Sequence, residues 1–310
     1  MVNIIDSIIL SYVTMIGHYS FDAYCLSAGQ DVGHFLPRGH GHNEYISLSP
    51  IQQIYSEGGE YKTVLFAPNE SKILIWNISK SLKNDSTIYD YVGNYSWKDK
   101  YSVSYSKQVM IDNESVLLYS PSIRTLPDEE LTDPMYQIRT LRTNEPVKEI
   151  RIFAHAINNY KSKVLPECYL DASFSLKPDR KKFVEAMNWL PQINIVDISS
   201  GKVNGRRLKE VQDESVFSTD MKDAMFCYKH VVSDDNHIYA LWAGSPRSEL
   251  RPDIGYHTVH VFDWEGKLIK KYKLKEPINE LTLDMQNGIL YGWNTEKQIL
   301  YRYNTMLSDV

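Results

Sequence analysis

Cysteine is scarce in this chain, and its spacing excludes two kinds of small scaffold. The 310 residues contain three cysteines: Cys25, Cys168 and Cys227. This spacing fits neither a Cys-x-x-Cys metal knuckle nor a dense disulfide framework. Cys25 and Cys227 lie in apolar, strand-like runs, where a buried free thiol is expected. One disulfide among the three stays open for an oxidising compartment.

Long apolar runs are also missing. The most apolar stretch, residues 4–16, contains Asp6 and is shorter than the roughly 20 residues that a spanning helix needs. It lacks the basic leader and small-residue cleavage site of a signal peptide. We therefore expect no transmembrane segment, although an export signal removed from a mature form is compatible with the sequence.

The chain has no excess of positive charge. Lys and Arg total 34 against 39 Asp and Glu, which gives a net charge of −5 at pH 7. Nucleic-acid binding depends on clustered Lys and Arg that face phosphates. The basic runs at residues 180–182 and 267–275 are short, as expected for solvated surface. We expect no nucleic-acid partner.

Catalytic motifs are absent as well. The sequence contains no G-x-S-x-G elbow, P-loop, H-E-x-x-H or G-x-G-x-x-G. The carboxylate pairs at residues 128–130 and 234–235 lie in polar, turn-like sequence, and nothing places two carboxyl groups across a sugar. We expect no catalytic residues, no cofactor and no metal, and we favour a role other than catalysis.

Short strand-like runs fill the chain instead. The 22 Tyr, 6 Trp and 9 Phe suit a pleated surface, on which flat and branched side chains pack well. Clusters of Gly, Asn, Asp, Ser and Pro separate the runs. One stretch, residues 179–189, predicts a helix or a turn with an insertion. The predicted strands are residues 7–13, 19–26, 64–66, 72–76, 116–120, 150–154, 194–198, 237–242, 258–263, 268–273 and 288–293.

A repeated unit is clearest in the last third. The runs 237–242 and 258–263 are followed by a turn at 264–266, in which Gly266 supplies a positive φ, and 267–272 returns antiparallel. A second unit runs from Leu281 to Tyr303. Units recur about every 45–55 residues, the size of a four-stranded blade, so this chain holds six.

We therefore predict an all-β fold, a six-bladed β-propeller with four-stranded antiparallel blades. The propeller forms a single domain over residues 1–310. Blades stack radially because one four-stranded sheet leaves an apolar face uncovered. The last unit supplies about three strands, so we expect N-terminal sequence to complete it and the N- and C-terminal strands to close the ring. The main alternative is a pair of β-sandwiches.

One segment carries a resemblance to a known family. Residues 37–45, PRGHGHNEY, resemble the R-G-x-G-P-x-E-[FY] signature of six-bladed, TolB-like propellers of Bacteroides-type bacteria. Residues 241–247 and 260–267 also look like this family, whereas His42 replaces the preferred Pro. The resemblance implies an exported lipoprotein or periplasmic protein. It supports fold and compartment rather than activity.

The loop from Arg38 to Glu44 is a candidate ligand site. Gly39 and Gly41 let backbone amides approach a ligand, and Arg38 can grip a carboxylate or phosphate. The interpretation we favour is an Arg38–Glu44 ion pair that holds an inter-blade loop, with glycines for turn geometry. His40, His42 and Glu44 have the alternation of three zinc ligands, but exposed histidines are the simpler explanation.

A long loop at residues 245–253 is the second candidate. Loops of such length are often functional. We expect one mouth of a central channel to be lined by Arg247, Glu249, Arg251 and Asp253, with His257 nearby. The alternative is a solvated charged loop whose charges pair with one another. Strand-ending aromatics, Trp76 among them, could stack on a sugar or peptide, but packing between blades is the favoured explanation.

These features predict a non-enzymatic binding propeller, located in the periplasm or at the cell surface. The partner would be a protein, a peptide or a carbohydrate, and tethering by a removed lipoprotein signal stays open. The alternative is a hydrolase or lyase with a polar or metal site at the channel mouth. The candidate ligand-binding residues are Arg38, His40, His42, Glu44, Arg247, Glu249, Asp253 and His257.

Overall fold

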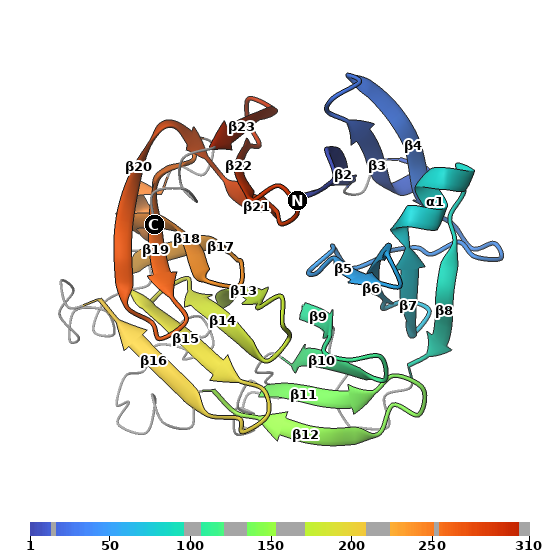
Figure 1. The fold of residues 1–310 in the computed structure, drawn as a ribbon, viewed down its shortest axis with the longest axis horizontal. Coiled ribbons are helices and arrows are strands. Elements are labelled where there is room, and N and C mark those ends of the chain that lie inside the picture. Colours follow the sequence, from blue (N-terminus) through green and yellow to red (C-terminus); the bar gives the residue numbers. More distant parts are fainter. Residues whose placement is uncertain are drawn as a thin grey trace. The chain divides into compact units, whose positions relative to one another are not determined.

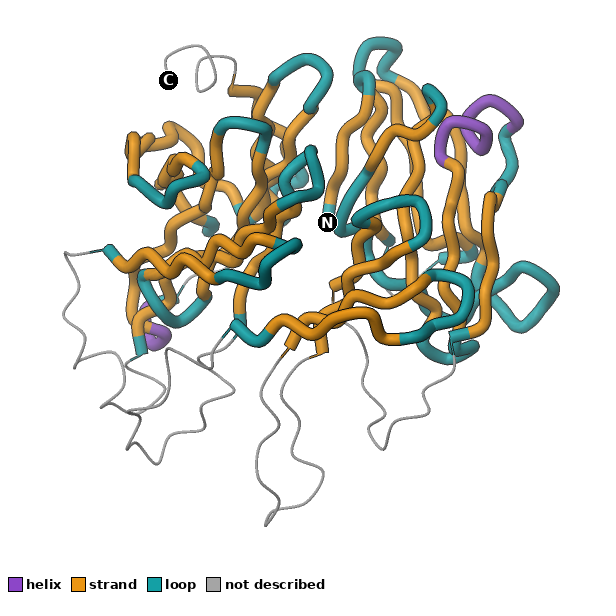
Figure 2. The backbone as a smooth tube through the Cα atoms, turned by 60° about the horizontal axis from the view of Figure 1, so that its bottom comes forward, coloured by secondary structure: helices purple, strands orange, loops and turns teal. Residues whose placement is uncertain are grey.

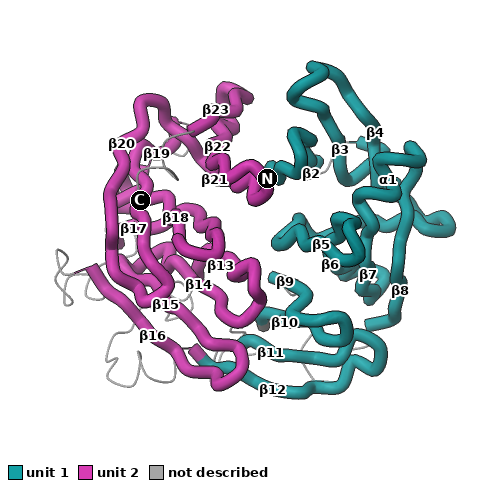
Figure 3. The backbone as a smooth tube through the Cα atoms, in the orientation of Figure 1, with its two compact units in different colours: residues 1–151 teal, residues 152–310 magenta. Residues whose placement is uncertain are grey.

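The chain is a six-bladed β-propeller with four-stranded antiparallel blades, as its periodicity predicts. The computed structural model describes residues 1–13, 17–95, 107–120, 135–152, 171–208, 224–250 and 254–303. Residues 1–151 and 152–310 form two compact units with three sheets each (Figure 3). Strands dominate both units, and the described helices are short (Figure 2). That residues 1–310 make one domain stays a prediction.

The first unit contains three four-stranded sheets, which we call blades one to three (Figure 1). Within each blade, neighbouring strands follow one another in sequence. Helix α1 (Ile78–Asn84) connects the last two strands of blade two. The strands are β1 (Val2–Ile5), β2 (Ile8–Tyr12), β3 (Tyr19–Cys25), β4 (Gln30–Pro37), β5 (Tyr55–Glu57), β6 (Glu60–Ala67), β7 (Lys72–Asn77), β8 (Tyr89–Asn94), β9 (Lys107–Met110), β10 (Ser115–Ser120), β11 (Met135–Thr140) and β12 (Pro146–Ile150).

The second unit contains blades four to six, again as antiparallel meanders (Figure 1). A 3-10 turn, η1 (Arg247–Glu249), follows the second strand of blade five. The strands are β13 (Ala172–Leu176), β14 (Lys182–Met187), β15 (Gln192–Asp197), β16 (Val203–Arg207), β17 (Met225–Ser233), β18 (His237–Pro246), β19 (Tyr256–Asp263), β20 (Leu268–Ile278), β21 (Glu280–Asp284), β22 (Ile289–Asn294) and β23 (Ile299–Tyr303).

Two expectations about local structure were wrong. Residues 179–189 contain strand β14, not a helix, because β14 pairs with β13 on one side and β15 on the other and buries most of its side chains. Tertiary pairing here overrides the helical preference of Glu185, Ala186 and Met187. The strand predicted at 150–154 ends at Ile150, and residues 153–154 lie outside the described part.

We expected N-terminal sequence to complete the last blade, but the N-terminal strand pairs within the first blade. Strand β1 pairs with β2 inside blade one, with Val2 opposite Ser11 and Ile5 opposite Ile8. Blade six has three strands, β21 to β23, within the described residues. The N-terminal strand therefore belongs to the first blade.

Helix α1 begins directly after strand β7. Asn77 caps it by accepting a hydrogen bond from the Lys80 amide at 2.9 Å, and Asp85 ends it in a left-handed conformation. Such a cap replaces a partner that the first helical turn lacks. In the described part of the chain, no helix is long and apolar enough to cross a membrane.

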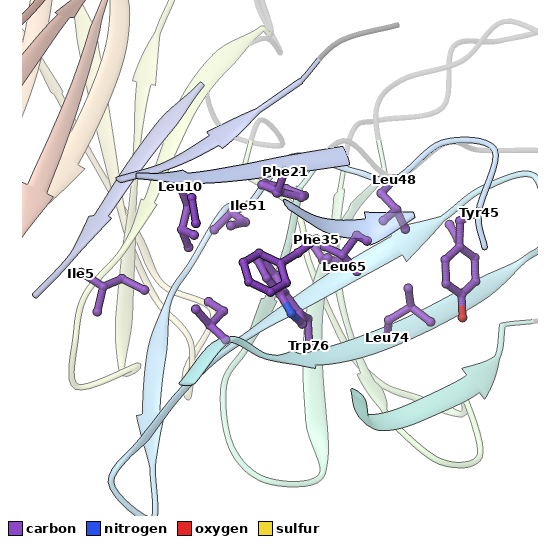
Figure 4. Close-up of a cluster of buried hydrophobic side chains, with 14 residues drawn as sticks. Ile5, Leu10, Phe21, Phe35, Tyr45, Leu48, Ile51, Leu65, Leu74 and Trp76 are labelled. Atoms are coloured by element: carbon purple, nitrogen blue, oxygen red, sulfur yellow. The ribbon is translucent and has the colours of Figure 1, made fainter. Parts of the chain in front are cut away.

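The core of the first unit centres on Trp76 (Figure 4). Its ring lies 5.4 Å from Phe21 and 5.8 Å from Phe35, centroid to centroid. Its indole N–H donates to the Ser81 hydroxyl at 2.9 Å. Trp76 is fully buried, so packing, not ligand stacking, is its role.

Candidate functional site

One end of blade five carries three of the predicted residues. Arg247 and Glu249 lie in η1, directly after β18, and His257 lies near the start of β19. All three side chains are exposed. Arg251 and Asp253 fall outside the described residues.

The segment that carries Arg247 is anchored at both ends. The Arg247 amide donates to the Ala224 carbonyl at 2.8 Å, and the Leu250 amide donates to the Arg247 carbonyl at 3.2 Å. Leu250 also packs against the apolar cluster that includes Phe226 and Tyr256. Because the backbone is already held in place, ligand binding would have to order only the side chain.

Trp189 supports the Arg247 guanidinium. The guanidinium carbon lies 5.6 Å from the centre of the Trp189 ring, a cation–π arrangement worth about 0.5–1 kcal/mol at an exposed site. Trp189 meets Phe226 edge to face at 5.0 Å, and Phe226 lies 6.3 Å from Tyr256. Phe226 and Tyr256 are buried. The exposed Arg247 guanidinium therefore lies over Trp189, which packs on two buried aromatic residues, Phe226 and Tyr256.

We call Trp189, Arg247, Glu249 and His257 the Arg247 surface. Within the described ranges, no carboxylate forms an ion pair with Arg247. The Trp189 ring lies beside the guanidinium, and the guanidinium N–H groups can donate to an acceptor. The His257 Nδ1 lies 3.3 Å from the Leu274 carbonyl oxygen. With Nδ1 as donor, Nε2 remains an acceptor.

Sequence analysis missed Trp189 because it lay inside the predicted helix. Trp189 follows β14 in blade four, whereas Arg247 follows β18 in blade five. Only the stacking of the two blades brings them together. The useful signal is the sequence Asn188-Trp189-Leu190-Pro191, which reads as a turn because Pro disfavours helical continuation.

In the loop from Arg38 to Glu44, in the first unit, the charged side chains already bind neighbouring groups. Arg38 donates from Nε to the Ser20 hydroxyl at 3.2 Å and from Nη2 to the Val13 carbonyl. The Glu44 carboxylate accepts from the Gly41 amide at 2.9 Å. Among the described contacts, Arg38 and Glu44 form no ion pair with each other, contrary to our expectation. Each side chain instead makes the hydrogen bonds given above.

The glycines of this loop make room for Glu44. A Cβ on Gly41 would lie 2.9 Å from the Glu44 carboxyl carbon, and one on Gly39 would overlap the same carboxylate. His40 and His42 are exposed. Across the residues that the structure describes, no group of three or more His, Cys, Asp or Glu is arranged to hold a metal ion.

The strongly shifted pKa values lie at positions with structural explanations. Burial lowers the pKa of His230 to about 4, while its Nδ1 accepts from the Leu281 amide at 3.3 Å. Hydrogen bonds from Ser199 and Ser200 lower the pKa of Asp197 to about 2. Burial raises the pKa of the Cys227 thiol, and Cys25 and Cys227 are both free. Cys168 lies outside the described residues.

Comparisons with known proteins support the fold. Residues 173–286 match the model of a family described as TolB-like 6-blade propeller-like. This range contains all four residues of the Arg247 surface. This match does not reach the signature-like residues 37–45. A search of the curated proteins finds no match.

Solved structures with similar architecture include two from bacteria. A member of the DUF4221 family from Bacteroides vulgatus is 12% identical, with 93% of this chain and 84% of that chain covered at a TM-score of 0.57. BamB from Moraxella catarrhalis is 14% identical, with 97% and 83% covered at a TM-score of 0.42. The first of these likenesses supports the propeller fold and nothing further.

Proposed function

We propose that this chain is an exported, non-enzymatic binding propeller that holds an acidic protein or peptide segment at the Arg247 surface. The observation that carries the proposal is the Arg247 guanidinium, which is exposed, makes a cation–π contact with Trp189 and is not paired with any described carboxylate. The ring contact favours positions of the guanidinium over Trp189, and a carboxylate fits the N–H fork of a guanidinium with two hydrogen bonds.

An acidic polypeptide fits better than a carbohydrate. Sugar binding uses an open aromatic face, whereas Trp189 is half-buried and Arg247 lies over its ring. Trp76, another candidate platform, is fully buried. A protein ligand would contact Arg247 together with the exposed Glu249 and His257. These three residues form the kind of polar rim that is typical of protein interfaces.

Binding is favoured over hydrolysis or elimination. Catalytic acids and bases are recognised by shifted pKa values that converge in one site. The large shifts at His230, Asp197 and Cys227 have separate structural causes in burial or turn hydrogen bonds. The Arg38–Glu44 loop is left out of the proposed site because Arg38 and Glu44 already bind groups of their own unit.

An array of peptides with zero, one or two carboxylates tests the proposal. Wild-type protein should retain peptides with Asp or Glu and lose them as salt rises. Hydrogen bonds to charged groups contribute about 1.5–3 kcal/mol, so Arg247→Ala should weaken binding by about tenfold or more. Arg247→Lys keeps the positive charge but lacks the two-pronged N–H geometry, so its affinity for the peptides should lie between those of the wild type and Arg247→Ala.

Ser248→Ala is the matched control, since Ser248 is an exposed neighbour within η1. Trp189→Leu should weaken binding by removing the support for Arg247. Equal binding by wild type, Arg247→Ala and Arg247→Lys would contradict the proposed site.

Export is supported by the resemblance to TolB-like propellers, which extends from the sequence to the family match over residues 173–286. Fractionation of the source cells, followed by antibody detection, checks this part separately. Recovery in the cytoplasmic fraction would refute export and leave the binding proposal standing.

A further inference from the structure

Strand β20 forms the outer edge of blade five and carries a concentration of positive charge (Figure 1). The strand, Leu268–Ile278, contains four lysines and one acidic residue, Glu276. A further lysine, Lys267, directly precedes the strand and is exposed. The chain as a whole has a net charge of −5. This edge therefore has a charge of the opposite sign to that of the whole molecule.

Three of these lysines form a row on one face of the strand. Lys271, Lys273 and Lys275 occupy alternate positions and are exposed. Tyr272 and Leu274, which lie between them, belong to the packing of the apolar cluster between blades five and six. Alternate side chains of a strand point to the same face, and each residue advances the strand by about 3.4 Å, so the row is roughly 13 Å long. The sheet thus holds three cations in a line.

The outer strand of blade four, β16, adds another exposed cation beside this edge. The Arg206 Nε donates to the Glu265 carbonyl at 3.3 Å, and the side-chain amide of Asn204 donates to the same carbonyl at 3.2 Å. Glu265 lies in the turn that leads into β20, so these two hydrogen bonds hold β16 against that turn. The side chain of Arg206 is exposed. We use the name basic edge for Arg206, Lys267, Lys271, Lys273 and Lys275.

Protection of a sheet edge does not account for so many charges of one sign. Charged side chains on an outer strand discourage pairing with another chain. Two other outer strands of this chain have fewer charges, since β8 carries Asp90 alone and β12 carries Lys148 beside Glu149. Within the described residues, no carboxylate forms an ion pair with Lys273 or Lys275. The charge of the basic edge is therefore available to an anionic partner.

An exposed apolar side chain lies among these cations. Ile269 is 41% exposed. The register of β20 against β19 shifts at this point, because Leu268 lies opposite Phe262 and Lys270 lies opposite Val261. Ile269 therefore occupies a β-bulge, a feature that redirects a side chain. Surfaces that bind at a membrane interface combine Lys or Arg with apolar side chains that enter the boundary between head groups and acyl chains.

We propose that the basic edge binds the anionic surface of a lipid bilayer, with its cations near the lipid phosphates and Ile269 at the interface. Lysine supplies a point charge that attracts phosphate without a fixed hydrogen-bond geometry, so a row of lysines suits several head groups at once. The net charge of the chain is negative, so the attraction is confined to this edge and turns β16 and β20 toward the lipid. The basic edge shares no residue with the Arg247 surface, and the two proposals are independent.

Sedimentation of the full chain with lipid vesicles tests the proposal. Vesicles of phosphatidylcholine alone carry no net charge, whereas vesicles with equal parts of phosphatidylcholine and phosphatidylglycerol are anionic. The protein should sediment with the anionic vesicles and stay in solution with the neutral ones. The bound fraction should fall as salt rises, because salt screens the attraction between exposed charges. Equal sedimentation with both kinds of vesicle, or with neither, overturns the proposal.

Two double variants with the same change of charge locate the binding surface. K273Q/K275Q removes two cations of the basic edge, and K181Q/K229Q removes two exposed lysines of the same unit that lie outside its outer strands. One lysine near an anionic membrane changes the affinity about fivefold, so K273Q/K275Q should weaken binding about 25-fold. K181Q/K229Q should bind like the wild type, and circular dichroism checks that both variants fold. Equal loss in the two variants would refute the proposal, because net charge alone would then explain the binding.

Soluble poly-glutamate and the variant I269S test the alternative partner, an acidic polypeptide. Poly-glutamate offers negative charge without a lipid interface, so at equal total charge it should leave the protein on the anionic vesicles. I269S should weaken vesicle binding severalfold, because an apolar side chain that leaves water at the interface contributes to affinity. Displacement from the vesicles by poly-glutamate would identify an acidic polypeptide as the partner and overturn the lipid proposal. Vesicle binding by I269S equal to that of the wild type would overturn it as well.

Discussion

His230 gives the second unit a pH dependence that can be worked out from its surroundings. Its Nδ1 accepts a hydrogen bond from the Leu281 amide, which links β17 to β21. Burial lowers the pKa of the imidazole from 6.5 to about 4, against the opposing attraction of Glu280. The neutral ring is therefore the form that blade packing requires, because a protonated Nδ1 cannot accept.

The sign and size of the effect follow from this difference. In the unfolded chain the imidazole has its ordinary pKa, so it takes up a proton near pH 6.5, while in the folded chain it resists protonation until about pH 4. Stability is therefore complete above pH 6.5 and falls as the pH drops from 6.5 to 4. At about 1.4 kcal/mol for each pKa unit, the loss reaches at most about 3 kcal/mol.

Urea unfolding from pH 8 to pH 4.5 measures the loss, and His230→Gln is the reference. The Gln side chain offers an amide oxygen as acceptor and does not titrate. Other groups titrate alike in both proteins, so the difference between the two curves isolates His230. Exchange of the Leu281 amide should quicken in the wild type below pH 6.5. Parallel curves for the two proteins would refute this account of His230.

Three further changes test the packing of the described residues. Ser81→Ala removes the acceptor of the buried Trp76 indole and should lower the free energy of unfolding by about 1–3 kcal/mol in urea titrations; an unchanged midpoint would contradict the bond. Gly41→Ala crowds the Glu44 carboxylate and should lower the melting temperature, but much less in a Glu44→Ala background. With the other two cysteines replaced by Ser, buried Cys227 should react with a thiol reagent only as the protein unfolds, and fast labelling of native protein would count against its burial.

The fold could be predicted because its turns are encoded locally. Residues 196–202 and 262–267 share a strand, an Asp, a turn and a Gly. In both turns the Asp carboxylate accepts from a turn amide: Asp197 from Ser200, and Asp263 from Lys267, each at 2.8 Å. The glycines at the end of the turns have φ of 75° and 82°, a region that favours Gly. Repeats of such a unit specify a propeller without knowledge of any long-range contact.

The candidate site could be predicted only in part. The long loop and its charges indicated Arg247, Glu249 and His257, and the structure places them at one end of blade five. Trp189, which contacts Arg247, comes from another blade. It follows the helix-forming residues Glu185, Ala186 and Met187, which led to the wrong prediction of a helix. Its role depends on stacking between blades four and five, which local preference does not encode.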